Sequence, residues 1–177
     1  MKILIMCEGP NELAIVKLLL ENNKFKFTND DLVTLTPFHA RQLASSTAVK
    51  TALNIYKGEF VIYRIGDTLA DNLRIPTEYA HRITDVEKYC TKPELEILLI
   101  ISEGLDKEFN KVKSHISPKD FAKTFIKCNR KKYNNSTFFY IDYYGDNIEA
   151  LVSAIKNYKQ THGAHKKDEL YIADLLK

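Results

Sequence analysis

Hydrophobic and polar positions along the first 65 residues form alternating blocks that predict strands and helices in turn. Short continuous apolar runs indicate buried strands, whereas apolar residues three to four positions apart indicate one apolar face of a helix. The expected elements are strands over residues 2–7, 32–36 and 60–65, and helices over residues 11–22, with Asn11 as its N-cap, and 42–56. Alternation of this kind is typical of βαβ units. We therefore expect an α/β fold, with a mostly parallel sheet and helices on both faces.

The pattern after Pro76 is mainly helical. The most apolar helical segment is PELEILLIISE, and the sequence Ser-Pro-Lys-Asp further on is typical of a helix start. Helices are expected over residues 93–103, 117–128, 146–158 and 168–176, and one further strand over residues 137–143. No internal repeat or linker is evident. We therefore expect a single domain over residues 1–177, with extra helices in its C-terminal half.

Composition excludes several classes of protein. Hydrophobic residues make up 45% and charged residues 28%, which is ordinary for a globular protein, and the net charge is only +3. No apolar stretch approaches the roughly 20 residues of a membrane span, and the start lacks a signal-peptide core, so we expect a cytoplasmic protein without membrane contact. Cys7, Cys90 and Cys128 are too widely spaced for a disulfide framework or a zinc site. Phosphate-binding Gly-x-Gly-x-x-Gly and Walker motifs do not occur.

Acidic residues follow two of the expected central strands. Glu8 ends the first strand, Asp67 follows the third, and Asp71 comes four residues later. Because ligands collect at the carboxyl ends of parallel strands, neighbouring strands would bring these carboxylates together. Mg²⁺ is usually held by one or two carboxylates with waters and phosphates, so these residues are candidate ligands for Mg²⁺ or Mn²⁺. Helix N-terminal electrostatics and ordinary turn chemistry explain the same residues without any function.

The stretch "ILIMCEGPNE" resembles the first motif of Toprim-type domains, in which a hydrophobic strand runs into Glu-Gly and then a helix. That family has a compact parallel α/β fold and binds Mg²⁺ in topoisomerases, primases and nucleases. The resemblance implies that Glu8 is the metal-binding glutamate and that Asp67 is the first aspartate of an Asp-x-Asp motif. The sequence departs from the family pattern at Leu69, and the next acid is Asp71.

A second segment, "KPELEILLIIS", is similar to an Asn-Pro-x-Phe-Glu-hydrophobic segment of RloB-like proteins, small bacterial Toprim-like proteins associated with defence or abortive infection. The resemblance implies a catalytic role for Glu96. On a helix Glu96 would lie apart from the apolar face of Leu95, Leu98 and Leu99, with Glu94 exposed, so Glu96 is equally a solvated residue. A buried Glu96 would require a partner, because an unpaired buried carboxylate costs several kcal/mol.

Basic residues gather between Lys111 and Lys132. The candidates for nucleic-acid contact are Lys119, Lys123, Lys127, Arg130, Lys131 and Lys132. The first three recur at four-residue spacing and would share one helix face, and Tyr133 would add an aromatic ring for stacking. A solvated helix face has the same composition. His39, after the second expected strand, is a weaker candidate for a ligand contact.

Two functions remain open from the sequence. One is a Mg²⁺- or Mn²⁺-dependent phosphodiesterase, a nuclease acting on RNA or DNA, with Glu8 and Asp67 holding the metal and Asp71 and Glu96 assisting. The other is a non-catalytic Toprim-like module that binds nucleic acid, a nucleotide or a partner protein, which the missing second aspartate favours. A subunit of a larger complex is also compatible with the sequence.

Overall fold

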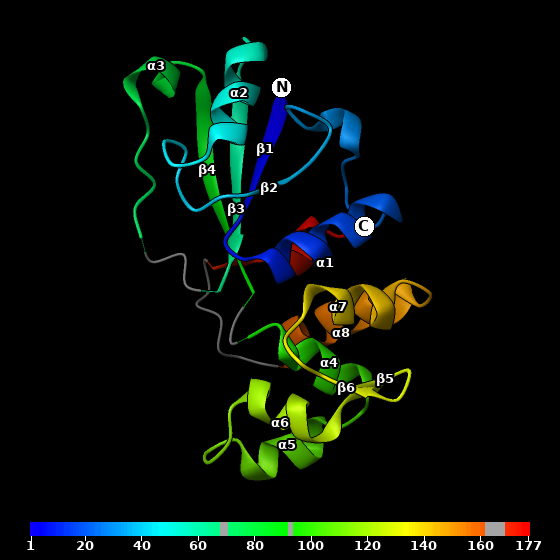
Figure 1. Cartoon of the computed structure of the whole chain (residues 1–177). Helices are drawn as coiled ribbons and strands as arrows, with labels where there is room; N and C mark the ends of the chain where they lie inside the picture. Colours follow the sequence, from blue (N-terminus) through cyan, green and yellow to red (C-terminus); the bar gives the residue numbers. More distant parts are fainter. Residues whose placement is uncertain (68–70, 92–93, 162–168) are drawn as a thin grey trace.

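The computed structural model describes residues 1–67, 71–91, 94–161 and 169–177. Its centre is a parallel sheet in the order β2-β1-β3-β4-β7. The strands are β1 (Lys2–Cys7), β2 (Phe38–His39), β3 (Phe60–Gly66), β4 (Ile83–Cys90) and β7 (Leu170–Tyr171). Figure 1 shows this sheet in the upper part of the molecule and most of the C-terminal helices below it. The expected α/β fold with a parallel sheet is confirmed; the Toprim-like label stays a prediction.

Helices cover both faces of the sheet, because successive side chains of a strand point to opposite sides. On one face Leu4, Met6 and Ile62 pack beside α2 (Thr47–Ile55), with the short α3 (Thr77–Ala80) on the same side. On the other face Ile5, Cys7 and Ile65 belong to a larger cluster with the remaining long helices. Those helices are α1 (Pro10–Glu21), α4 (Glu96–Ser102), α5 (Asp106–Val112), α6 (Pro118–Phe125), α7 (Thr137–Tyr144) and α8 (Ile148–Thr161). The last four residues of β1 are buried, which explains why its sequence is a continuous apolar run.

Smaller elements complete the described chain. They are the 3₁₀ helices η1 (Asn29–Asp31) and η2 (Ile172–Leu175) and a hairpin of β5 (Lys127–Cys128) and β6 (Lys131–Lys132). Within the described residues, no helix combines the length and apolarity that crossing a membrane requires.

The expected strand over 32–36 is wrong. Leu32 makes only an isolated bridge to Ile3, and the short strand β2 follows Pro37 instead. Leu35 has a positive φ of 62°, which ends any extended run there. The sheet also contains β4, which was not expected. Its sequence ITDVEKYC carries charges, and only its last two residues are buried, so it lacks the apolar run that marks β1 and β3.

The expected strand over 137–143 is a helix, α7. Its first turn is capped by Ser136, whose hydroxyl accepts a hydrogen bond from the Phe138 N–H. Phe139, Tyr140 and Tyr144 are its buried residues, so the helix turns them toward the core while Phe138 faces solvent. The aromatic run TFFYIDYY favours a strand by composition, and packing against α1 and α8 overrides that preference.

Several boundaries also differ from expectation. Helix α1 starts after Gly9, so Asn11 lies inside it rather than capping it. Helix α2 starts after Ser46, which caps it. Helix α6 ends at Phe125, so Lys127 is not on its face. The helix expected over 168–176 is β7 followed by η2, and residue 168 lies outside the described residues.

Candidate functional site

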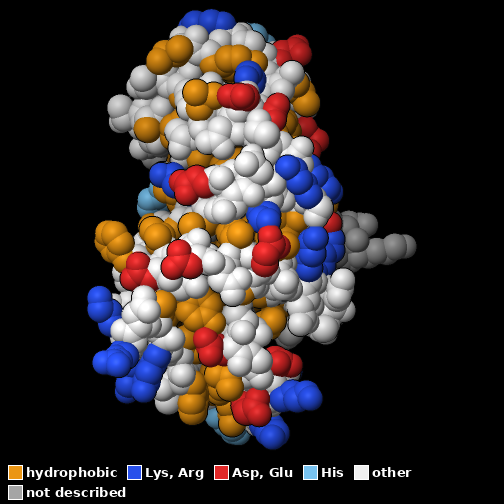
Figure 2. All heavy atoms as spheres, turned by 90° about the vertical axis from the view of Figure 1, so that its right-hand side faces the viewer, with side chains coloured by type: hydrophobic (Ala, Val, Ile, Leu, Met, Phe, Trp, Pro, Cys, Tyr) orange, Lys and Arg blue, Asp and Glu red, His pale blue; other side chains and the backbone are white. Residues whose placement is uncertain are grey.

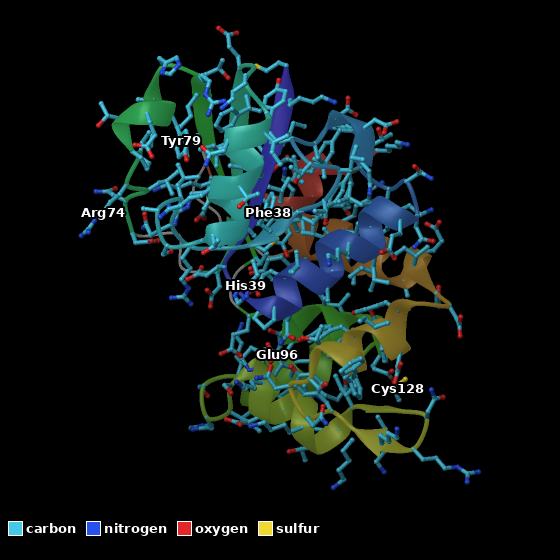
Figure 3. All side chains as sticks on the ribbon, turned by 45° about the horizontal axis from the view of Figure 1, so that its top comes forward. Phe38, His39, Arg74, Tyr79, Glu96 and Cys128 are labelled. Atoms are coloured by element: carbon cyan, nitrogen blue, oxygen red, sulfur yellow. The ribbon has the colours of Figure 1, made fainter. Side chains whose placement is uncertain are left out.

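A polar cavity of about 350 Å³ lies where β1 and β3 end. Its walls come from the β1–α1 loop, the start of α1, the loops after β2 and β3, and the starts of α4 and α6. The residues that line it are Glu8, Gly9, Asn11, Glu12, Arg41, Asp67, Glu94, Leu95, Glu96, Lys119 and Asn135. Five carboxylates and two cationic side chains therefore share one small volume. Figure 3 places Glu96 at the start of α4, below the end of the sheet where α1 begins.

Pairing of two neighbouring strands sets the position of Glu8. Cys7 of β1 is in register with Ile65 of β3, and the Glu8 N–H donates to the Ile65 carbonyl at 2.8 Å. The Glu8 side chain then lies over Gly66, where an added Cβ would lie only 2.6 Å from the Glu8 Cβ. Glycine at this position leaves the room that Glu8 needs. Asp67, the next residue, therefore reaches the same cavity from the adjacent strand.

Arg41 lies beside Glu8 at the mouth of the cavity. Its Nη2 is 3.2 Å from Glu8 Oε1, and its Nε donates to the Glu8 carbonyl at 3.5 Å. The Glu8 side chain is only 10% exposed, whereas that of Arg41 is 66% exposed. Arg41 is therefore the solvent-facing member of the pair, and its guanidinium is accessible to an anion that enters the cavity.

Glu12 stands in the first turn of α1, one turn after Glu8. Burial raises the pKa of the Glu12 carboxyl above its usual range, and the charges of Asp67, Glu8 and Glu96 raise it further. Burial also raises the pKa of the Glu94 carboxyl, while a hydrogen bond from the Lys119 N–H at 3.1 Å opposes that rise. The carboxylates are thus close enough to resist joint ionisation.

Glu96 is the most deeply buried of the cavity's acids, at 6% exposure. The Tyr133 hydroxyl donates to its Oε1 at 2.6 Å and lies 3.0 Å from the Tyr140 hydroxyl. Burial raises the pKa of both tyrosines above the usual range, which keeps their hydroxyls available as donors. The buried Glu96 carboxylate therefore has the hydrogen-bond partner that a buried polar group needs, and this partner is the Tyr133 hydroxyl.

Asn135 joins this network to α1. The Asn11 amide donates to Asn135 Oδ1 at 3.1 Å, and the same oxygen lies 3.1 Å from the Tyr133 hydroxyl. The Thr137 hydroxyl in turn donates to Asn11 Oδ1 at 3.0 Å. The segment leading into α7 is thereby fixed against both α1 and Glu96.

The structure brings together three of the acids singled out from the sequence, Glu8, Asp67 and Glu96. It does not bring Asp71 there. Arg64, a buried residue of β3, donates from Nη2 to Asp71 Oδ1 and from Nη1 to its carbonyl, both at 2.8 Å. Arg64 also lowers the Asp71 pKa through that side-chain hydrogen bond. Asp71 therefore neutralises a buried guanidinium outside the cavity.

The basic candidates are distributed over three places. Lys119 lines the cavity, Lys123 lies further along α6, and the other four lie on or between the hairpin strands. The expectation that Tyr133 offers a ring for stacking is wrong, because it is 2% exposed and bonded to Glu96. His39 is exposed and is not among the cavity residues.

Several polar residues of the cavity were not predicted from the sequence as site residues, among them Glu12, Arg41, Glu94 and Asn135. Glu94, expected to be exposed, is partly buried and bonded to α6. Glu12 carries a usable signal, since its position one helical turn after Glu8 places both acids at one helix start. Arg41 and Asn135 carry none, because long-range folding alone brings them to the cavity.

No family model matches the chain, and no curated protein or solved structure is significantly similar to it. The candidate site therefore rests on its own geometry.

Proposed function

We propose that the protein is a divalent-metal-dependent phosphodiesterase that acts on nucleic acid, with its active site in the polar cavity. The observation that carries this proposal is the gathering of five carboxylates with Arg41 and Lys119 at the ends of β1 and β3. An excess of negative charge in so small a volume calls for a cation, and carboxylate oxygens are ligands that Mg²⁺ and Mn²⁺ prefer.

The donor set fits such an ion. Across the described residues, no three His, Cys, Asp or Glu side chains form a ready-made metal cage. Mg²⁺ does not need one, since it commonly takes one or two carboxylates and completes its shell with waters and substrate phosphate. Glu8 and Asp67, on adjacent strand ends, would hold the metal. When bound, the ion would polarise a phosphoryl oxygen and lower the pKa of a bound water.

The remaining residues act on the substrate. Arg41 and Lys119 supply positive charge for phosphate oxygens. Glu12, with its raised pKa, can hold a proton at a pH where an ordinary glutamate has lost it, which suits proton transfer to a leaving group. Glu96 is held in place by Tyr133, and can orient or deprotonate a nucleophile.

The test begins with Mn²⁺ titration calorimetry on the wild type, Glu8→Gln and Asp67→Asn. We expect the wild type to bind and both variants to lose at least about tenfold in affinity, since each removes a charged ligand. Glu78→Gln, an exposed acid on α3, is the matched control and should keep full affinity. Asp71→Asn should also keep it, because that carboxylate binds Arg64 instead.

Nuclease assays on RNA and DNA with Mg²⁺ and Mn²⁺ then test the chemistry. Cleavage by the wild type and its loss in Glu8→Gln would support the proposal. Metal binding without cleavage of any nucleic acid would leave a binding module, and no metal binding with or without an oligonucleotide present would overturn the metal site.

A further inference from the structure

An exposed aromatic ring lies next to the wall of the cavity. Phe138, in the first turn of α7, is 75% exposed, although its neighbours Phe139 and Tyr140 are buried. It follows Asn135, a cavity residue, by only three positions. The Phe138 ring is therefore not part of the core and is accessible to a ligand.

The hairpin of β5 and β6 precedes Asn135 and Phe138 in the chain, and it carries several basic side chains. Lys127 pairs with Lys132 and Cys128 with Lys131, and Asn129 and Arg130 form the turn with positive φ angles of 50° and 66°. Lys127, Arg130, Lys131 and Lys132 are all exposed. Lys132 precedes Asn135 by three residues, so their Cα atoms are at most about 11 Å apart. The end of the hairpin therefore lies close to the cavity along the chain.

Helix α7 packs against β5, so the hairpin adjoins the helix that carries Phe138. Phe138 and Asp142, four residues apart, share the exposed face of α7. Figure 2 shows Lys and Arg side chains gathered low on the face turned to the right of Figure 1, the side on which β5 and β6 lie.

We propose that the hairpin and Phe138 form a platform for single-stranded nucleic acid that leads into the cavity. The lysines and Arg130 bind the phosphates, and one unpaired base stacks on the Phe138 ring. This inference rests on the proposed function and names its substrate class. An unpaired strand is required because a base in a duplex has its faces covered by its neighbours. Closely spaced basic residues around an exposed aromatic ring are typical of single-strand binding, whereas lysine is depleted in the cores of protein–protein interfaces.

The test measures fluorescence anisotropy of labelled 15-nucleotide oligo-uridine and oligo-thymidine and of a 15-base-pair duplex, in EDTA and low salt. Chelation removes any contribution of a metal, so binding reports the platform alone. We expect the single strands to bind at least about tenfold more tightly than the duplex, with Phe138→Ala weakening single-strand binding by about tenfold. Phe138→Tyr, which keeps a ring, should retain affinity.

Two controls match these variants. Ile55→Ala removes a large apolar side chain that is 74% exposed on α2, on the opposite face of the sheet, and should leave the affinity unchanged. Lys132→Gln should weaken binding and reduce the magnitude of the slope of log affinity against log salt by about 0.7. Lys50→Gln, which changes an exposed lysine of α2, should alter neither the affinity nor the slope.

Equal affinity for duplex and single strands, or no effect of Phe138→Ala, would overturn the platform. Absence of oligonucleotide binding would do the same and would leave the surface to a protein partner. The proposed function fails separately: oligonucleotide binding in EDTA without Mn²⁺ binding or cleavage would support the platform and reject the phosphodiesterase.

Discussion

The two walls of the cavity are built in different ways. On the sheet side, Glu8 and Asp67 are adjacent because β1 and β3 are paired in register, and the backbone itself sets their separation. On the helical side, Glu96 is held by Tyr133, 37 positions further along the chain, and Glu94 is held by the start of α6. One wall therefore depends on strand pairing, and the other on hydrogen bonds between segments that are distant in the sequence.

We expect the greatest loss of stability from a variant on the helical side of the cavity. Tyr133→Phe removes the hydroxyl that donates to buried Glu96, so a buried carboxylate loses its partner, and we expect the free energy of unfolding to fall by about 2–3 kcal/mol. Tyr144→Phe is the matched control. Its buried hydroxyl bonds the neutral Ser102, and its loss should cost about 1 kcal/mol. Urea unfolding measures both, and equal losses would show that Tyr133 does not support a charged group.

The next effect disturbs the sheet wall. In Gly66→Ala, the added methyl would overlap Glu8, so we expect a cost of about 1–3 kcal/mol and weaker Mn²⁺ binding. Gly58→Ala is the comparison, since its methyl would meet only the ring and hydroxyl of Tyr56, outside the cavity. Urea unfolding and calorimetry report the two consequences. Unchanged stability and Mn²⁺ affinity in Gly66→Ala would mean that Glu8 does not need the space over Gly66.

We expect a smaller effect from Glu12, whose carboxyl makes the free energy of unfolding depend on pH. The Glu12 pKa is raised above its ordinary value of 4.5, chiefly by burial and then by acids of both walls. Well below pH 4.5 the carboxyl is protonated in both the folded and the unfolded chain, so it makes no difference to the free energy of unfolding. As pH rises through the folded pKa, the folded chain retains a proton that the unfolded chain has lost, so the free energy of unfolding falls.

Glu12→Gln should remove that fall. The free energy of unfolding of the variant minus that of the wild type should therefore be larger at pH 7 than at pH 4. Urea unfolding at both pH values measures this difference. Glu78→Gln, with an exposed carboxylate, should show no such difference. A wild-type advantage over Glu12→Gln that grows toward pH 7 would contradict the assigned direction.

The two acids after β3 show where local sequence stops being informative. Asp67 and Asp71 look equivalent in the sequence, yet one lines the cavity and the other binds Arg64. Arg64, a buried charge inside the apolar run of β3, requires an acidic partner, and only the folded loop decides which acid supplies it. The same holds for Tyr133, whose place in a basic segment favours an exposed ring while packing buries it.

The local sequence was enough to predict β1, β3 and the common edge at which Glu8 and Asp67 lie, because short apolar runs that end in turn residues favour buried strands and parallel strands end at a common edge. Tertiary structure decided the rest. It made a helix of the aromatic run at 137–144, recruited the polar β4, and joined Glu96 to Tyr133. Those outcomes depend on contacts between segments that are distant in the sequence, and the local pattern of apolar residues does not specify such contacts.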